Sequence, residues 1–232
     1  MKVVEIPFGA VGLDFLEPPS SFVVAQEIAA YVLPGTRTGV TYVERYLENL
    51  SAAEVAWWHS LGVGIAPIGE GRASGWGADA GAADGAREVA RARALGFPTG
   101  LHLGCDAEAM SCPPDVAQAF LRAWCGPPGA AGHPQRLYVG AGVPLDATQL
   151  YGLPFNWYDE SLSEVQRVAV VGYASVQLFP TQKLALKSGA WPVDVNMVRR
   201  DKHLPARAPT MVVADDWGGY PDRIYFALHR LE

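Results

Sequence analysis

Residues 99–108 read TGLHLGCDAE, a short apolar run that ends in two carboxylates. Such a run predicts a buried strand, and residues two apart on a strand point to the same side. Asp106 and Glu108 should therefore face one space, roughly 7 Å apart. Two acids at the C-terminal end of a strand suit acid/base chemistry on a sugar, although a solvated acidic turn or a helix cap would give the same pattern.

The composition limits the classes of function. Half of the 232 residues are hydrophobic, which is enough to bury a sizeable core, and the net charge is -6. This charge gives no basic footprint for nucleic acid. Cys105, Cys112 and Cys125 leave an odd cysteine without a CxxC pair, and the histidines are scattered. We therefore expect no disulfide framework, no metal and no cofactor.

The N-terminal residues, MKVVEIP, predict no targeting segment. The run is too short and carries charge too early for a signal peptide. No apolar run in the chain is long enough to span a membrane. We expect a protein that is cytoplasmic as synthesised and that leaves the cell, if it does, by a route without an N-terminal signal. The oligomeric state stays open.

Strand and helix patterns alternate along most of the chain, which predicts a parallel sheet or barrel with helices outside. A glycine- and proline-rich stretch at 127–129 is expected to be a loop. Predicted strands cover 9–15, 39–46, 65–68, 99–106, 136–140, 155–157, 175–179 and 191–196. Predicted helices cover 22–33, 52–61, 79–95, 115–124, 146–152 and 161–171, and a hairpin is expected from 211–213 and 223–228.

This order of elements predicts the fold class. We expect an α/β protein, an irregular (β/α)8 TIM-like barrel with reduced helices in the last quarter and a C-terminal β-hairpin. A doubly wound open sheet is the alternative, but no GxGxxG joins a strand to a helix near the start. We expect a single domain over 1–232, with a core at about 9–197 and a β extension at about 205–232.

Acidic residues follow several of the predicted strands. In a barrel, functional side chains sit at the C-terminal strand ends and in the loops after them. Asp14, Glu70, Asp106, Glu108 and Asp194 all fall at such positions. We therefore expect the acids to surround one pocket. A hard divalent cation held by these acids is a weaker alternative.

Short motifs at the same positions resemble a known family. They are Gly12-Leu-Asp14-Phe, Asp106-x-Glu108, Val176-Gln177 and Val193-Asp194-Val-Asn196. These motifs resemble the family 25 lysozymes, which are muramidases on an irregular barrel. The spacing is more similar to a bacterial glycoside-hydrolase-like domain related to them. That domain also has a strand like Tyr42–Tyr46 and a helix start like Gly77–Ala83.

The resemblance implies a role for each acid. Glu108 matches the general acid, which protonates the glycosidic oxygen. Asp106 matches the carboxylate that assists at the anomeric centre, or the group that positions an attacking amide or water. Asp14 and Asp194 match flanking acids that shape the site. The candidates for substrate contact are Arg45, Tyr46, Glu70, Trp76, Tyr138, Trp157, Gln177 and Asn196, although aromatic residues in strands are often packing residues.

Two further stretches carry expectations. The glycines of 70–77, together with Trp76, predict a mobile flap beside the pocket. Arg45 is expected to face the barrel mouth with Tyr46 and to pair with an acid or a substrate carboxylate. His102 and Cys105 lie inside the central strand and are expected to be buried core residues.

The sequence therefore predicts a glycoside hydrolase-like protein. The expected activity is cleavage of a β-linked glycan, with bacterial peptidoglycan as the substrate, in a lysin delivered by phage lysis or by a secretion system. The alternative is a non-catalytic glycan-binding or structural module of a phage or secretion apparatus on the same barrel, because a fold does not imply a function.

Overall fold

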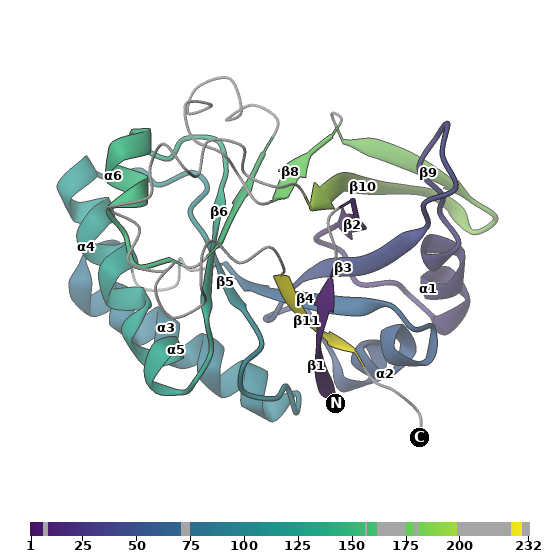
Figure 1. Cartoon of the computed structure of the whole chain (residues 1–232), viewed down its shortest axis with the longest axis horizontal. Helices are drawn as coiled ribbons and strands as arrows, with labels where there is room; N and C mark the ends of the chain where they lie inside the picture. Colours follow the sequence, from purple (N-terminus) through teal and green to yellow (C-terminus); the bar gives the residue numbers. More distant parts are fainter. Residues whose placement is uncertain are drawn as a thin grey trace.

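The structure, a computed structural model, describes residues 1–6, 9–70, 75–155, 157–161, 175–178, 181–198 and 224–228 (Figure 1). The first half contains β1 (Lys2–Ile6), β2 (Val11–Asp14), α1 (Phe22–Ala29), β3 (Val40–Tyr46), α2 (Ala52–Ser60), β4 (Gly64–Gly69), α3 (Ala78–Ala94) and β5 (Leu103–Asp106). The second half contains α4 (Pro114–Trp124), α5 (Gly126–Ala130), β6 (Gln135–Val139), α6 (Ala147–Tyr151), β7 (Trp157–Glu160), β8 (Ser175–Gln177), β9 (Gln182–Leu186), β10 (Gly189–Val198) and β11 (Ile224–Leu228).

Eight of these strands pair in a ring. The order is β4-β3-β2-β10-β8-β7-β6-β5, and β5 pairs again with β4 at Ile68 with Gly104 and at Gly69 with Cys105. Figure 1 shows α3, α4, α5 and α6 outside the strands on one side and α1 and α2 on the other. The predicted fold class, an α/β protein with an irregular TIM-like barrel, is confirmed.

Strand β10 departs from the expected parallel arrangement. It runs antiparallel to both of its barrel neighbours, β2 and β8, whereas the other neighbouring pairs in the ring are parallel. The cause is local, because β9 and β10 form a hairpin around Lys187 and Ser188, and no crossover helix lies between them. Asp194 therefore lies where β10 enters the barrel, level with Asp14 at the end of β2.

The helices begin where side chains satisfy their free backbone groups. Ser21 accepts a hydrogen bond from the Val24 amide, and Ser51 accepts one from the Glu54 amide. Asp146 and Gln149 form a complete capping box at α6. The expected loop at 127–129 is wrong, because these residues lie in the short helix α5, which has proline in its first turn. The helix expected at 161–171 lies almost entirely outside the described residues.

The two ends of the chain meet on the sheet. Strand β11 pairs antiparallel with β1 over Lys2–Ile6 and touches β4 at Ile65. The N-terminal strand was missed because its alternation is short and is cut by charged residues. The expected partner strand of β11, at 211–213, lies outside the described residues. The described part of the C-terminal extension thus joins β1 to the barrel strand β4.

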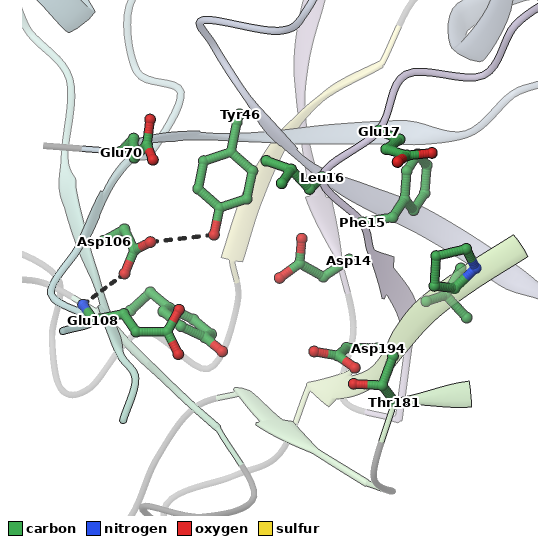
Figure 2. A pocket seen from close by; sticks show the side chains of 13 residues that line it. Asp14, Phe15, Leu16, Glu17, Tyr46, Glu70, Asp106, Glu108, Thr181 and Asp194 are labelled. Atoms are coloured by element: carbon green, nitrogen blue, oxygen red, sulfur yellow. Dashed lines mark hydrogen bonds between the residues drawn. The ribbon is translucent and has the colours of Figure 1, made fainter. Parts of the chain in front are cut away.

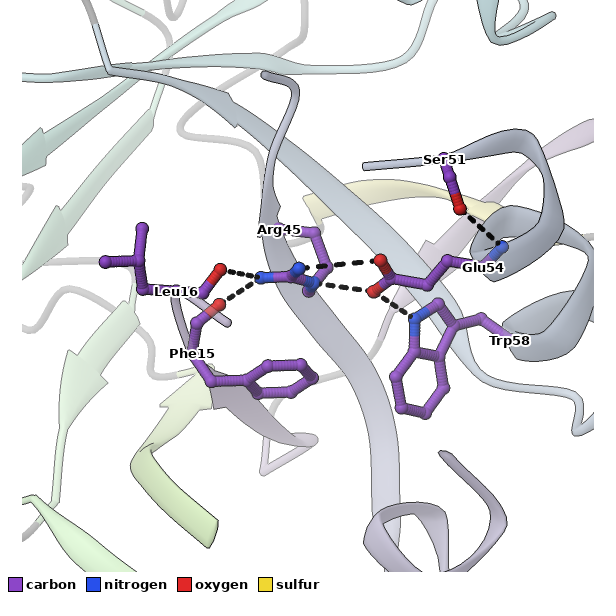
Figure 3. A network of polar contacts seen from close by, with 6 residues as sticks. All are labelled: Phe15, Leu16, Arg45, Ser51, Glu54 and Trp58. Carbon is purple, nitrogen blue, oxygen red and sulfur yellow. Dashed lines mark hydrogen bonds and ion pairs between the residues drawn. The ribbon is translucent and has the colours of Figure 1, made fainter. Parts of the chain in front are cut away.

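A buried ion pair fastens the end of β2 to α2 (Figure 3). Arg45 donates from Nε to Glu54 Oε1 at 2.7 Å and from its Nη1 to the Phe15 and Leu16 carbonyls. Trp58 Nε1 donates to the same Glu54 oxygen at 2.9 Å. The expectation that Arg45 faces the barrel mouth is wrong, because side chains alternate along β3 and Arg45 points outward between two inward neighbours.

This arrangement predicts a large loss of stability for Glu54→Ala. The change leaves a guanidinium that is fully buried without its carboxylate partner, and breaking a buried pair in this way costs about 3–5 kcal/mol. Chemical denaturation should show the loss in the free energy of unfolding. Glu17→Ala, which removes an exposed carboxylate from the loop that Arg45 holds, is the control and should change little. Equal effects of the two substitutions would contradict this account of Arg45.

Candidate active site

A pocket of about 480 Å³ opens at the end of the barrel where β2, β3 and β5 terminate (Figure 2). The structure brings the four acids Asp14, Asp106, Glu108 and Asp194 together around it. Tyr46, Glu70 and Tyr138 also line it, as the sequence led us to expect. The remaining lining residues, which sequence reasoning missed as site residues, are Phe15, Leu16, Glu17, Thr181, Pro192 and Val193.

Asp106 and Glu108 reach the pocket through a turn. Strand β5 ends at Asp106, whose Oδ1 accepts the Glu108 backbone N–H at 2.7 Å. The next residue, Ala109, has φ of 51°, in the left-handed region. The expected strand spacing of the two acids is therefore wrong. An aspartate that bonds the backbone two residues on reverses the chain here, and both acids still face the same space.

The position of Glu108 depends on a close approach of Gly140, which follows β6. A Cβ added at Gly140 would lie 2.6 Å from Glu108 Cβ. The backbone of the turn is held against the same loop, since the Ala109 amide donates to the Ala141 carbonyl at 2.7 Å. The absence of a side chain at Gly140 thus lets Glu108 lie along the loop after β6.

A hydrogen bond orients Asp106 from the other side. Tyr46, at the end of β3, donates its hydroxyl to Asp106 Oδ2 at 3.2 Å. Each oxygen of Asp106 thus accepts one hydrogen bond, from the Glu108 amide and from Tyr46. On β6, Tyr138 is the register partner of Asp106. Burial first, and then the charge of Asp14, raise the pKa of both tyrosines above the usual range, so both phenols remain protonated hydrogen-bond donors.

Asp14 and Asp194 face each other across the β2–β10 pairing, where they are register partners. Burial raises the pKa of Asp14 well above its usual range, and the neighbouring carboxylates of Glu44 and Asp194 add to the effect. Burial also raises the pKa of Asp194, while hydrogen bonds from Thr181 and Gln177 oppose the rise. The two aspartates form the wall of the pocket opposite Asp106 and Glu108 (Figure 2).

Glu70 lies exposed at the rim, directly after β4. Its backbone N–H donates to Glu48 Oε1 at 2.9 Å, which holds the end of the strand. Part of the expected flap, 71–74, lies outside the described residues. The expectation that Trp76 contacts substrate in the pocket is wrong, because Trp76 does not line the pocket. Its ring packs edge-on against Phe120 of α4, with the ring centroids 5.2 Å apart.

The other candidates for substrate contact do not line the pocket either. Arg45 points outward to α2, and Trp157 is fully buried at the start of β7, with Nε1 donating to Asp159 Oδ1 at 3.1 Å. Asn196 and Gln177 are buried register partners one layer deeper in the barrel than Asp194. The sequence motif does not reveal this depth. Residues two apart on a strand point to the same side, but they lie at different positions along the barrel axis.

A charged layer beneath the pocket was not expected. Arg136, on β6, is fully buried and donates from Nη1 to Glu44 Oε2 at 3.0 Å. Its Nε lies 3.1 Å from Asp159 Oδ2. Burial alone would lower the pKa of Arg136, but the two carboxylates raise it. The available signal was the presence of charged residues in two largely apolar predicted strands, with Glu44 and Arg45 in 39–46 and Arg136 at the start of 136–140.

The pocket offers carboxylates and phenols, but no assembled metal site. Within the described residues, no group of three or more histidine, cysteine, aspartate or glutamate side chains is arranged to hold a metal ion. His102 lies buried beneath the pocket, where burial and then Arg136 lower its pKa to about 3. Cys105 is also buried, and burial raises its thiol pKa. What the site can do chemically therefore depends on its carboxyl groups.

Comparison with known proteins gives the family. A family model described as the Rv2525c-like, glycoside hydrolase-like domain matches residues 29–198. The chain belongs to this family. The relationship that the short motifs suggested is thereby confirmed, and the domain is glycoside hydrolase-like. No curated protein matches the sequence. No helix among the described residues is long and apolar enough to cross a membrane.

Several solved structures share the fold. An uncharacterized protein of B. stearothermophilus has a TM-score of 0.59 and 18% identity, over 88% of this chain and 99% of that one. The Tat-secreted protein Rv2525c of Mycobacterium tuberculosis, in complex with L-tartrate, has a TM-score of 0.55 and 16% identity, over 82% and 96%. The catalytic domain of endolysin ply40, from bacteriophage P40 of Listeria monocytogenes, has a TM-score of 0.53 and 13% identity, over 82% and 93%.

The contact at Gly140 predicts a specific local displacement. In Gly140→Ala, the new methyl group overlaps Glu108 Cβ, so Glu108 must move by several tenths of an ångström or more. A crystal structure of the variant should show Glu108 displaced, with the barrel strands unchanged. Gly126→Ala is the matched control, because a Cβ there meets nothing within 4 Å. An unmoved Glu108 in Gly140→Ala would contradict the packing described.

Proposed function

We propose that this protein is a glycoside hydrolase that cleaves a β-linked glycan, with bacterial peptidoglycan as its substrate. The observation that carries the proposal is the pairing of Asp106 with Glu108 in one pocket. Asp106 is held by two hydrogen bonds, and Glu108 lines the same pocket from the end of the same turn. One oriented carboxylate beside a second carboxyl group is what glycosidic cleavage requires.

In this proposal Glu108 is the general acid. It donates its proton to the glycosidic oxygen as the bond to the anomeric carbon breaks, and the leaving sugar departs as an alcohol. Asp106 assists at the anomeric carbon, where positive charge develops, or positions an attacking amide or water. Its two hydrogen bonds keep its oxygens directed into the pocket, so that little reorganisation is needed during the reaction.

The walls of the pocket suit a sugar. Tyr46 and Tyr138 supply phenol hydroxyls, and Glu70 supplies an exposed carboxylate at the rim. Leu16 and Pro192, both exposed, supply apolar surface against which the faces of sugar rings can pack. The β9–β10 hairpin carries Pro192 and Asp194 on one side of the opening. The proposed glycan would lie between this hairpin and the turn that carries Glu108.

The choice of peptidoglycan is supported by family membership and by the fold that the chain shares with an endolysin catalytic domain. A cell-wall substrate lies outside the cytoplasm. The proposal therefore includes delivery, by phage lysis or through a secretion system, to the wall.

The central test is Glu108→Gln, which keeps the shape of the side chain but cannot deliver a proton. Cleavage of peptidoglycan or chitooligosaccharide should fall by about 10²- to 10⁴-fold, while folding and sugar binding persist. A turbidity assay and a reducing-end assay measure the rate, and calorimetry measures the binding. Asp106→Asn should also lose most of the activity, because it removes the charge that assists at the anomeric carbon.

Glu27→Gln is the matched control, since it makes the same chemical change on α1, outside this pocket. It should leave cleavage unchanged. Cleavage that survives Glu108→Gln undiminished would show that another acid is responsible. Wild-type protein that binds the glycan intact and cleaves no peptidoglycan or chitin would instead support a non-catalytic glycan-binding module on the same barrel.

A further inference from the structure

Three carboxyl groups lie side by side on neighbouring strands, two in the wall of the pocket and one beneath it. Asp194 on β10 is the register partner of Asp14 on β2, and Asp14 is the register partner of Glu44 on β3. Neighbouring strands lie about 4.8 Å apart. Asp14 and Asp194 line the pocket, and Glu44 is fully buried beneath it. Three adjacent carboxylates in a poorly solvated space repel one another, and proton uptake by one of them relieves the repulsion.

The nearby cations do not neutralise this row. Arg136 donates to Glu44, but it also pairs with Asp159 on the far side, so its charge is divided between two carboxylates. Arg45 lies next to Glu44 in sequence, but its guanidinium points out of the barrel to Glu54 and the Phe15 carbonyl. Within the described part of the chain, the row and Asp159 thus carry more acidic groups than Arg136 can balance.

Hydrogen bonding distinguishes the three acids. Glu44 accepts from Arg136 at Oε2 and from the Asn196 side chain at Oε1, 3.3 Å away. Asp194 accepts hydrogen bonds from Thr181 and Gln177. Asp14 Oδ1 and Asp194 Oδ1 are both buried without a hydrogen-bond partner among the described residues. Asp14 differs in its place between the other two acids, which gives it a carboxyl neighbour on each side. A buried carboxylate oxygen without a donor is costly, and like charges on both sides add to the cost, so Asp14 is the member of the row for which protonation is most favourable.

We propose that Asp14, flanked by the carboxyl groups of Asp194 and Glu44, is protonated at neutral pH. Asp14 then faces the pocket as a neutral hydrogen-bond donor and can donate to an acceptor oxygen of a bound glycan. Glu44, which does not line the pocket, is a positioning residue that acts through Asp14. The inference deepens the proposed function and rests on it only for the identity of the ligand.

The groups that face Asp14 from the other strands agree with this assignment. Asp106, on β5, adds a further negative charge, and its effect, like that of Glu44 and Asp194, is to raise the pKa of Asp14. Arg45 acts in the opposite direction but more weakly than either neighbouring carboxylate. The phenols of Tyr46 and Tyr138 stay neutral and supply no positive charge. Burial, the largest effect, also favours the neutral form of Asp14.

The test is a carbon-13 NMR titration of aspartate carboxyl groups in the full chain without ligand. The Asp14 signal is assigned by its loss in Asp14→Asn. In the wild-type protein this carboxyl group should still be protonated near neutral pH, well above the ordinary aspartate midpoint of about 3.9. Glu44→Gln should lower the Asp14 midpoint by about one pH unit or more, because one neighbouring like charge is gone.

Asp194→Asn provides a second route, because it removes the other neighbour and leaves the buried contacts of Arg136 intact. It should shift the Asp14 midpoint in the same direction, which keeps the test decisive if Glu44→Gln fails to fold. Glu17→Gln removes an exposed carboxylate at the pocket rim, outside the row, and should leave the midpoint unchanged.

A wild-type Asp14 that titrates near the ordinary aspartate midpoint would overturn the proposal, as would midpoints that respond equally to all three substitutions. The titration uses no glycan, so it separates the two hypotheses. Protein that cleaves nothing but keeps a raised Asp14 midpoint would contradict the proposed function alone. Active protein with an ordinary Asp14 midpoint would contradict this inference alone.

Discussion

The buried ion pairs of Arg136 with Glu44 and Asp159 constrain the interior of the barrel. The guanidinium of Arg136 is fully buried, and the carboxylates that satisfy it come from β3 and β7, while the group itself belongs to β6. An unpaired charge at this depth would be strongly destabilising. The three strands must therefore keep the spacing that brings Glu44 and Asp159 to the guanidinium. Gly104, on β5, leaves room for this group, since a Cβ there would lie 3.0 Å from Arg136 Nη2. The contacts of Arg136 thus connect β3, β6 and β7 beneath the pocket. Apolar side chains would not fix the relative positions of these strands with the same directional contacts.

The second constraint is the direction of β10. In a barrel with all strands parallel, functional residues come from C-terminal strand ends. Here the hairpin of β9 and β10 makes the last barrel strand run in the opposite direction. The residue of β10 that lies at the mouth of the barrel is Asp194, near the middle of the strand. Asp194 and Asp14 are direct register partners in this antiparallel pairing. The two aspartates lie side by side on one wall, facing the separately held Asp106 and Glu108.

Much of this arrangement could be predicted from sequence, for identifiable reasons. The alternation of apolar strands and capped helices specifies a barrel, and acids after successive strands must then meet at one end, as Asp14 and Asp106 do. Three features could not be predicted from the sequence. Arg45 and Tyr46 are neighbours in sequence, but only one of them can point inward, and composition did not decide which. The turn at Asp106 depends on a side-chain-to-backbone hydrogen bond. The depth of Asn196 and Trp157 depends on strand direction and register, which a motif of a few residues does not contain.

The polar interior also explains why the acids stay so close to one another. A stable fold would favour cations or apolar groups beside Asp14, since a buried oxygen without a donor and adjacent like charges both lower stability. The chain instead turns Arg45 away to hold the loop of Phe15 and Leu16, and it keeps Arg136 one layer down. The unneutralised carboxyl groups therefore gather at the pocket, whereas Arg45 pairs with Glu54, and Arg136 pairs with Glu44 and Asp159. Such a distribution is expected where unneutralised carboxyl groups serve a ligand rather than the fold, because local destabilisation is retained at sites that must interact with something outside the chain.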